Sequence, residues 1–227
     1  YRYVMTNSPD LRGIDVALLY QRDLFKLLSS RSISIPPLKQ YRPTRDLLHV
    51  SGLLLTGDTL DVFVCHLPSR SGGAKESESY RLYAAHILRM EVDSIMSIRS
   101  LPQVIIMGDF NDYPTNQSIQ KILEAEAPPV TTNNLASTTG STNFSTVAPS
   151  SLKLYHLLAR KAKSKDFGSY KYRGEWGLLD HLIVSGTLLN QSNHFFTSEE
   201  KANVCLLPFL LKDDEKYGDK EPFRTYK

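Results

Sequence analysis

The sequence has little cysteine, no long hydrophobic run and almost no excess of either charge. Its two cysteines, Cys65 and Cys205, are too few for a disulfide-stapled miniprotein. Cys65 lies in an apolar run where a buried free thiol is expected, although a pairing stays open. No segment approaches the ~18 consecutive apolar residues of a membrane span. The formal net charge of +3 is too small to indicate nucleic-acid or membrane binding by itself.

Several common catalytic signatures are missing as well. The sequence has no glycine-rich phosphate loop, no Cys/His zinc spacing and no nucleophile elbow. Its 41% hydrophobic residues support a large core and exclude a disordered or collagen-like chain. The 227 residues fit one large domain or two small ones. Because the first residue is Tyr rather than Met, we expect a longer product, and the compartment stays open, with secretion or the periplasm among the options.

Hydrophobic periodicity predicts alternating strands and helices. Short aliphatic or β-branched runs predict strands at 15–20, 50–55, 60–66, 104–107 and 178–184. Apolar residues recur at helical spacing across 77–100, and shorter patterns predict helices at 118–126 and 152–163. Gly57 and Asp58 predict a hairpin between the second and third strands, and the long helix is expected to cross over to the fourth. This pattern favours an α/β fold with a mixed sheet.

The stretch from Gly108 to Asn111 follows an apolar strand and is the most informative part of the sequence. Asp109 can accept a proton, orient a water or bind a cation, and Asn111 can donate to a phosphoryl oxygen without adding charge. If the strand continues, its period of two aims both side chains to the same side. A plain turn is the competing interpretation. The string Gly-Asp-Phe-Asn is nonetheless expected by chance in only about one in a thousand chains of this length.

A second candidate is His66, which ends the strand at 60–66, with Arg70 in the loop that follows. Histidine titrates near neutrality and can act as a general acid or bind an anion, and arginine can clamp a phosphate. A strand-end histidine with a structural role is the competing interpretation.

A third candidate is the pair Asp180 and His181, which interrupts the apolar strand at 178–184. An acid in such a run is costly without a partner, so Asp180 is either a buried hydrogen-bond acceptor or the group that orients a catalytic imidazole. His181 points to the opposite face and is interpreted as structural or at the rim.

Two basic segments are possible phosphate contacts. Arg42 and Arg45 lie in a polar segment before a strand, where a solvated loop is an equally good interpretation. The dense basic run at 160–165 is interpreted mainly as a solvated helix end, and only weakly as a nucleic-acid contact.

Together, a strand ending in His66, a strand followed by Gly-Asp-Phe-Asn, and Leu-Asp-His resemble the endonuclease/exonuclease/phosphatase superfamily, which includes deoxyribonuclease I. The resemblance covers nearly the whole chain, and segments 12–20 and 172–176 are similar to a bacterial branch of uncharacterised endonucleases. It implies a four-layer α/β sandwich of two mixed β-sheets flanked by helices. It also implies a phosphodiesterase site that depends on Mg²⁺ or Mn²⁺. We expect residues 1–227 to be a single domain of this type, truncated at both ends.

The resemblance assigns catalytic roles position by position. Asp109 would orient or deprotonate the attacking water and Asn111 would bind the scissile phosphoryl oxygen, and both are candidate metal ligands. His66 would stabilise the phosphoryl group or protonate the leaving oxygen. Asp180 would hold a second histidine, and Asp15 is our candidate for orienting His66.

The resemblance also suggests substrate contacts and missing parts. Arg45 matches an arginine that contacts phosphate in the deoxyribonuclease branch, and Arg70 and Trp176 are further candidate contacts. The family's first strand supplies an Asn, a following strand supplies the Glu that is the principal metal ligand, and a closing Ser-Asp-His supplies the second histidine. We expect all three outside this chain, and therefore expect this polypeptide alone to hydrolyse nothing measurable although its parent does.

The expected function is metal-dependent phosphodiester hydrolysis by an endonuclease acting on nucleic acid. A phosphomonoesterase, a sphingomyelinase or an inositol-phosphate phosphatase of the same superfamily would use the same residues. Only the loops near 69–73, 131–151 and 169–176 would decide between these activities. A non-catalytic binding domain is the alternative from another class. The expected partner is nucleic acid or another phosphodiester, and we expect a monomer without a membrane span.

Overall fold

The fold is built on one large mixed β-sheet. The computed structural model describes residues 1–39, 41–130 and 149–223. Its strands and long helix, in chain order, are β1 (Arg2–Met5), β2 (Ala17–Tyr20), β3 (Phe25–Ile33), β4 (Leu47–Leu54), β5 (Thr59–His66), α1 (Glu78–Ile98), β6 (Gln103–Asp109), β7 (Leu154–His156), β8 (Tyr170–Tyr172), β9 (Glu175–Gly177), β10 (Asp180–Ser185), β11 (Leu211–Asp213) and β12 (Lys220–Pro222). Short helical turns lie at Ser118–Ile122, Lys161–Lys163, Gly186–Leu189 and Pro208–Leu210.

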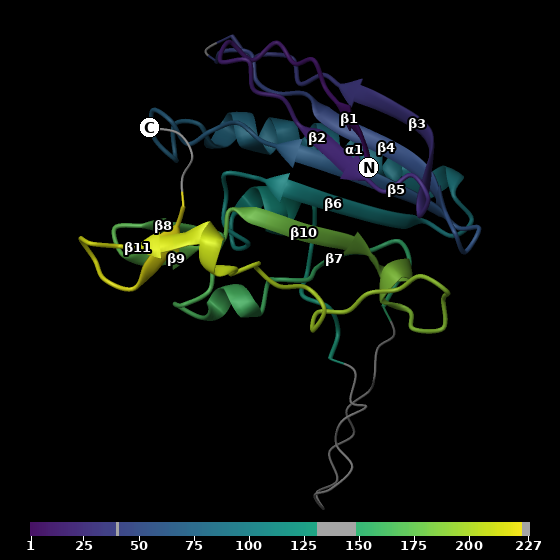
Figure 1. Ribbon diagram of the computed structural model, residues 1–227. Coiled ribbons are helices and arrows are strands. Elements are labelled where there is room, and N and C mark those ends of the chain that lie inside the picture. Colours follow the sequence, from purple (N-terminus) through teal and green to yellow (C-terminus); the bar gives the residue numbers. More distant parts are fainter. Residues whose placement is uncertain (40, 131–148, 224–227) are drawn as a thin grey trace, which may run out of the picture.

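The large sheet has the strand order β3-β4-β5-β6-β10-β7 (Figure 1). β5 and β6 run parallel, and the other neighbouring strands of this sheet run antiparallel. Three further antiparallel pairs, β1–β2, β8–β9 and β11–β12, form two-stranded sheets.

The two faces of the large sheet are covered by different elements. The buried side of α1 packs on one face against Phe63 and Ile106 of the central strands. β1–β2 covers the other face, where Val4 and Leu18 pack in the cluster that contains Val62. Figure 1 shows α1 and β1–β2 on opposite sides of the sheet. Along β5, even-numbered side chains therefore face β1–β2 and odd-numbered ones face α1.

The predicted strands and the predicted long helix are confirmed. Each predicted strand overlaps an observed one, and α1 occupies the predicted 77–100 segment. Gly57, with a φ of 87°, lies in the turn between antiparallel β4 and β5, and α1 connects the parallel strands β5 and β6. The α/β class with a mixed sheet is thus confirmed. α1, the large sheet and β1–β2 form three successive layers of the expected sandwich.

The predictions of helices at 118–126 and 152–163 were not accurate. The first is a single π-helical turn at Ser118–Ile122, and the second is wrong because the chain there forms β7. Leu154 pairs with Ser185 and His156 pairs with Ile183 of β10. A short apolar run fits helix or strand by periodicity alone, and here the available edge of β10 selects the strand. The polar loop predicted at 131–151 falls mostly on residues 131–148, which lie outside the described part of the chain.

Two expectations from composition can be compared with the structure. Cys65 is a buried free thiol, as expected, and Cys205 is an exposed free thiol. Across the described ranges, no helix has the length and apolarity needed to cross a membrane.

A buried polar cluster ties the end of α1 to the sheet. The Asp61 carboxylate in β5 accepts hydrogen bonds from His49 Nε2 (3.0 Å), from Arg99 Nε (2.8 Å) and from the Ser51 hydroxyl. Both Ser51 and Asp61 approach the same ring nitrogen of His49, whereas a Ser-His-Asp relay uses both nitrogens. Burial alone would raise the pKa of Asp61, but these hydrogen bonds lower it to about 2. The cluster is therefore interpreted as structural.

We expect Asp61→Asn to lower the free energy of unfolding by about 2 kcal/mol at pH 6. The folded-state pKa lies below the ordinary value of 3.8, so the stabilisation is complete above pH ~4 and is lost as the pH falls toward 2. Urea unfolding followed by the fluorescence of Trp176, the single tryptophan, measures the difference. The exposed Asp166→Asn is the matched control. A difference between wild type and Asp61→Asn that stays constant from pH 6 to pH 2.5 would contradict this account.

Candidate active site

The ends of three neighbouring strands carry His66, Asp109 and Asp180 in one row. His66 ends β5, Asp109 ends β6 and Asp180 begins β10, and the strand register pairs Asp109 with both of the others. His66 Nε2 lies 3.7 Å from Asp109 Oδ2. His66 is an even-numbered residue of β5, so the row lies on the sheet face opposite α1. The structure thus brings together three of the predicted catalytic residues.

The connection after β6 places Asn111 beside this row. Gly108 has a φ of 128°, and a Cβ there would lie 2.0 Å from the Cys65 carbonyl oxygen, so only glycine fits. Asn111 has a φ of 51°, and its N–H donates to Asp109 Oδ1 at 2.7 Å. Its Nδ2 donates to the Leu67 carbonyl at 3.0 Å. Asp109 and Asn111 are therefore neighbours through a tight turn, and the strand does not continue between them as the period-two argument required.

The charge state of Asp109 is set by burial and by its carboxylate neighbour. Burial, with a smaller contribution from the Asp180 carboxylate, raises the pKa of Asp109 to about 6, although the Asn111 N–H and Arg45 act in the opposite direction. Two adjacent carboxylates at a partly buried strand end favour a bound cation.

His66 is uncharged at neutral pH in this environment. Burial lowers its pKa to about 4, and the positive charges of Arg45 and Arg12 contribute to the lowering. A neutral imidazole can donate or accept a hydrogen bond, but it does not offset the charge of Asp109.

Arg45 is buried beneath the row rather than solvated. Its side chain is 2% exposed, with Nη1 3.2 Å from Asp10 Oδ2 and Nη2 2.6 Å from the Leu67 carbonyl. The same carbonyl accepts from Asn111, so Arg45 and Asn111 share an anchor. The Arg45 Nε has no hydrogen-bond partner within the described part of the chain. Burial would raise the pKa of Asp10, but hydrogen bonds from Arg12 and Arg45 lower it to about 2.

Asp15, the candidate for orienting His66, lies next to other groups. Its carboxylate accepts hydrogen bonds from the Ser8 N–H (2.7 Å) and the Thr6 hydroxyl (2.8 Å), and these hold its pKa below the usual range. The carboxylate that the structure places at His66 is that of Asp109.

Trp176 lines a cleft beside the turn, and Arg70 lies against the ring of Tyr113, which also lines it. The Arg70 guanidinium lies 4.9 Å from the centre of the Tyr113 ring, and Tyr113 directly follows Asp112. Tyr113 and Trp176 line a cleft of about 540 Å³ together with Pro114, Thr115, Gln120, Ala125, Glu126, Ala127, Ala159, Ala162, Lys163, Gly177 and Leu178. The cleft therefore borders both the turn after β6 and the chain that enters β10.

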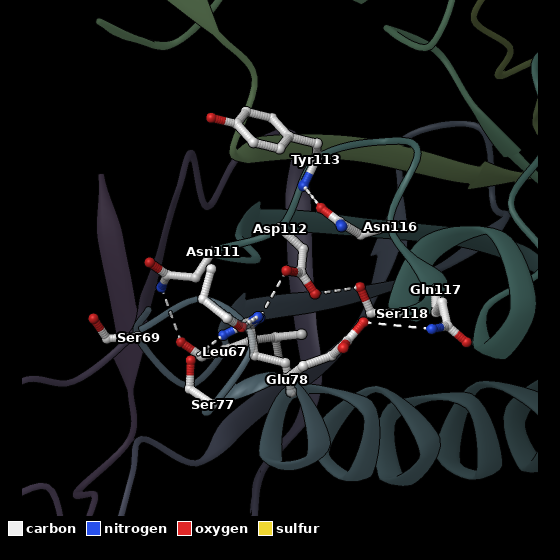
Figure 2. A network of polar contacts seen from close by, with 12 residues as sticks. Leu67, Ser69, Ser77, Glu78, Asn111, Asp112, Tyr113, Asn116, Gln117 and Ser118 are labelled. Atoms are coloured by element: carbon white, nitrogen blue, oxygen red, sulfur yellow. Dashed lines mark hydrogen bonds and ion pairs between the residues drawn. The ribbon is translucent and has the colours of Figure 1, made fainter. Parts of the chain in front are cut away.

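The residue after Asn111 was not a candidate from the sequence, yet it anchors the turn. Figure 2 shows Asp112 pointing toward Ser118 and toward α1. Its carboxylate accepts from Arg81 Nε (2.7 Å) and the Ser118 hydroxyl (2.7 Å), and the Arg81 and Asp112 side chains are 2% and 1% exposed. Arg81 falls on the apolar stripe of the long helix. A charged residue on a stripe that is buried needs a partner of opposite charge, so the position of Arg81 was the signal in the sequence for such a pair.

The donor set fits a divalent cation in part. Asp109 supplies a carboxylate, and Asn111 supplies an amide oxygen because its nitrogen already binds Leu67. Oxygen donors of this kind suit Mg²⁺ or Mn²⁺. Within residues 1–39, 41–130 and 149–223, no three His, Cys, Asp or Glu side chains are grouped so that they could hold a metal ion.

Comparisons with known proteins identify the family and the fold. The profile of the Endonuclease/Exonuclease/phosphatase family matches residues 1–227. The chain is similar in structure to ANGEL2, a 2',3'-cyclic phosphatase, with 15% identity, a TM-score of 0.56 and coverage of 81% of this chain and 62% of that one. It is also similar to the human Nocturnin catalytic domain, with 21% identity, a TM-score of 0.52 and coverage of 81% of this chain and 60% of that one. A functionally unknown protein from Enterococcus faecalis V583 is similar with 13% identity, a TM-score of 0.53 and coverage of 81% of this chain and 64% of that one.

These likenesses show the fold. The chain spans about three fifths of the length of the solved structures it resembles. A search of curated proteins finds no match.

Proposed function

The chain belongs to the endonuclease/exonuclease/phosphatase family, and on that premise we propose that it forms the core of a metal-dependent phosphodiester hydrolase, specifically an endonuclease acting on nucleic acid. The observation that carries this proposal is the row of His66, Asp109 and Asp180 beside the turn that bears Asn111. Such a row offers a proton acceptor, a neutral hydrogen-bond donor and an amide at one rigid sheet edge.

Each residue of the row has a role that follows from its surroundings. Asp109 orients or deprotonates the attacking water, because burial raises its pKa to about 6 and brings proton acceptance close to neutral pH. Neutral His66 donates a hydrogen bond to the phosphoryl group or to the leaving oxygen. Asn111 uses one Nδ2 hydrogen on Leu67 and keeps its second N–H and its Oδ1 for the substrate or a cation. The exposed Asp180 carboxylate is free to hold the second histidine of the family.

Asp109 and Asn111 would hold Mg²⁺ or Mn²⁺ at this edge. A bound cation supplies positive charge that stabilises the charge developing on the phosphoryl oxygens. Mg²⁺ in phosphoester enzymes commonly binds one or two carboxylates together with waters and substrate phosphate. We therefore propose that one more carboxylate, the family's Glu, comes from outside the described residues.

The proposal includes a domain larger than these 227 residues. β1–β2 turns Val4 and Leu18 toward the large sheet, while Tyr3, Met5 and Leu19 on its other face are exposed. An apolar outer face of this kind favours a further covering segment of the same domain. With the incomplete donor set, it supports the expectation that the isolated chain is inactive.

A nucleic-acid substrate is favoured by the composition of the cleft. Tyr113 and Trp176 supply aromatic surface next to the catalytic turn. Lys163 supplies positive charge in the lining of the cleft, and Arg70 supplies it against the Tyr113 ring. Aromatic rings that stack on bases, with cations that meet phosphates, are typical of sites that bind single-stranded nucleic acid. A phosphomonoesterase or cyclic phosphatase remains the second candidate, since ANGEL2 is a 2',3'-cyclic phosphatase.

We expect Trp176→Ala to raise KM for a nucleic-acid substrate by about 10- to 100-fold, because a stacked base contributes about 1–3 kcal/mol. Trp176→Phe keeps an aromatic face and should raise it less. Steady-state kinetics of the full gene product on a single-stranded oligonucleotide measure the change, with an oligonucleotide of abasic residues as a substrate that has no aromatic ring to stack. Equal losses on both substrates would argue against a base-binding cleft.

The proposed function is tested with the full translated product of the gene that carries these residues. Plasmid DNA, RNA, 2',3'-cyclic nucleotides, sphingomyelin and inositol phosphates are each incubated with Mg²⁺ or Mn²⁺, and with EDTA as the control. Metal-dependent cleavage inside a plasmid or an RNA supports the proposal, whereas activity confined to monoesters or cyclic phosphates selects the second candidate. No turnover of any substrate would leave a binding domain as the correct interpretation. The 227-residue chain, assayed in parallel, is expected to be inactive.

A further inference from the structure

Two buried histidines lie directly behind the catalytic turn, on the α1 face of the sheet. His156 in β7 is fully buried and His181 in β10 is 3% exposed. Their rings meet edge to face, with centroids 4.7 Å apart, and His181 also meets the buried ring of Phe110 at 5.0 Å. Neither histidine belongs to the row of His66, Asp109 and Asp180, because His181 points to the opposite side of β10 from Asp180.

The hydrogen bonds of this pair determine which nitrogen of each ring carries the proton. The Leu158 N–H donates to His156 Nδ1 at 3.1 Å, so this nitrogen is an acceptor and the proton of neutral His156 is on Nε2. His156 Nε2 contacts His181 Nδ1, which must then accept. The proton of His181 is therefore on Nε2, which lies 2.9 Å from the Asp112 carbonyl oxygen. Four buried polar groups are satisfied with both rings neutral.

We propose that His181 and His156 are positioning residues of the active site, with His181 holding the Asp112 carbonyl and His156 fixing the tautomer that allows it to do so. This inference rests on the proposed function for the use of the turn, but the hydrogen-bond relay itself is independent of activity.

The turn requires such support because its backbone is strained. Asn111 adopts a left-handed φ of 51°, a conformation that is unfavourable for most residues other than glycine and persists where its surroundings enforce it. The Phe110 N–H is held by the Leu179 carbonyl at 2.8 Å on one side of Asn111. The Asp112 carbonyl is held by His181 on the other side. The backbone is thus held at Phe110 and at Asp112, the residues on either side of Asn111, and the Asn111 side chain is positioned between these two anchors.

His156 acts through His181. Without a donor at His181 Nδ1, the imidazole can carry its proton on Nδ1, and its Nε2 lone pair would then face the Asp112 carbonyl lone pairs. Burial lowers the pKa of His181 to about 4 and that of His156 to about 3, so an imidazolium does not supply the missing donor at neutral pH. The four ring nitrogens are all engaged, which leaves no lone pair for a metal ion.

The first test is the tautomer state of the two rings in the 227-residue chain. Long-range ¹H–¹⁵N correlation spectra distinguish a proton on Nε2 from one on Nδ1. We expect both neutral rings to carry the proton on Nε2 at pH 7. A proton on Nδ1 of His181 would overturn the proposal, whether or not the protein is active.

The second test separates positioning from packing with a conservative rescue. His156→Gln places an amide N–H close to the position of Nε2, whereas His156→Leu has similar bulk and no donor. In the full gene product, we expect His156→Leu to lower kcat by about 10- to 100-fold with KM within about threefold, and His156→Gln to restore most of kcat. His86→Leu, on the exposed side of α1, is the matched control. Equal kcat values for His156→Leu and His156→Gln would overturn the role assigned to the donor.

If the wild-type product has no activity, the backbone amide signals of Asn111 and Asp112 decide instead. We expect His156→Leu to shift and broaden them and His156→Gln to leave them near their wild-type positions. Unchanged signals in His156→Leu would overturn the proposal. A missing activity with the expected tautomers and shifts would refute only the proposed function.

Discussion

Asp109→Asn is expected to lower hydrolysis of a phosphodiester by about 10²- to 10⁴-fold in the full gene product. The amide has the shape of the carboxylate but cannot take a proton from water, and it is a weaker ligand for a cation. The fold should be retained, because the only hydrogen bond that Asp109 Oδ1 receives from the turn is the Asn111 N–H, and an amide oxygen can accept it. Rates with saturating Mg²⁺ measure the loss.

The same variant should be more stable than the wild type in metal-free buffer. Burial and Asp180 raise the pKa of Asp109 to about 6, so its charge at pH 7.5 is unfavourable in the folded state. The side chain is 34% exposed, so after allowance for screening the gain is of order 1 kcal/mol, or about 2–4 °C in Tm. Because the folded pKa is raised, the gain is full above pH ~6 and vanishes below pH ~4.

The control for both effects is Asp23→Asn, whose side chain is 90% exposed. It should change neither the rate nor the Tm. An Asp109→Asn enzyme with wild-type rates would remove Asp109 from the mechanism, and a Tm lowered by several degrees would show that the carboxylate is a structural group. Loss of activity combined with a gain in stability is expected of a residue whose position serves chemistry.

The sequence predicted the residues of the row because strand ends are visible in a hydrophobic pattern. His66 and Asp109 each follow an apolar run, and Asp180 interrupts another, so all three were candidates before their spatial relation was known. Their meeting in one row depends on parallel pairing of β5 with β6 and antiparallel pairing of β6 with β10. Periodicity predicts strands but does not specify which neighbours they take.

Other parts of the site could not be predicted because their signals are long-range. Asp10 pairs with Arg45, which lies 35 positions away, and nothing in the local pattern of either residue identifies the other. β3 was missed because most of its side chains are exposed and polar, so its pairing with β4 rather than its own pattern makes it a strand. His156 falls in a segment predicted as a helix, and its contact with His181 follows only from the pairing of β7 with β10.

The buried pair of Arg81 and Asp112 gives the largest expected effect on stability. Arg81 donates through Nε to Asp112, through Nη1 to the Ser77 hydroxyl at 2.6 Å and through Nη2 to the Ala74 carbonyl at 2.6 Å. Figure 2 shows the Asp112 carboxylate between helix α1 and Ser118. The pair therefore joins the start of α1 to the turn that carries Asn111.

We expect Arg81→Met to lower the free energy of unfolding by about 3–5 kcal/mol, because it leaves the Asp112 carboxylate buried without its cation. The double variant Arg81→Met/Asp112→Leu removes both charges and should be less destabilised than the sum of the single variants. Urea unfolding followed by Trp176 fluorescence measures the free energy of unfolding of Arg81→Met, of Asp112→Leu and of the double variant. Arg22→Met is the matched control, since Arg22 pairs with Asp23 at the surface and an exposed pair contributes about 0–1 kcal/mol.

The double variant also tests why a buried ion pair lies beside the turn that carries Asn111. If the pair served stability alone, restoring stability with apolar side chains would restore activity. We expect instead that kcat stays about 10- to 100-fold below wild type, because Asp112→Leu removes the carboxylate that fixes the turn to α1 and to Ser118. A stable double variant with wild-type kcat would mean that the backbone hydrogen bonds on either side of Asn111 position it without help from the ion pair.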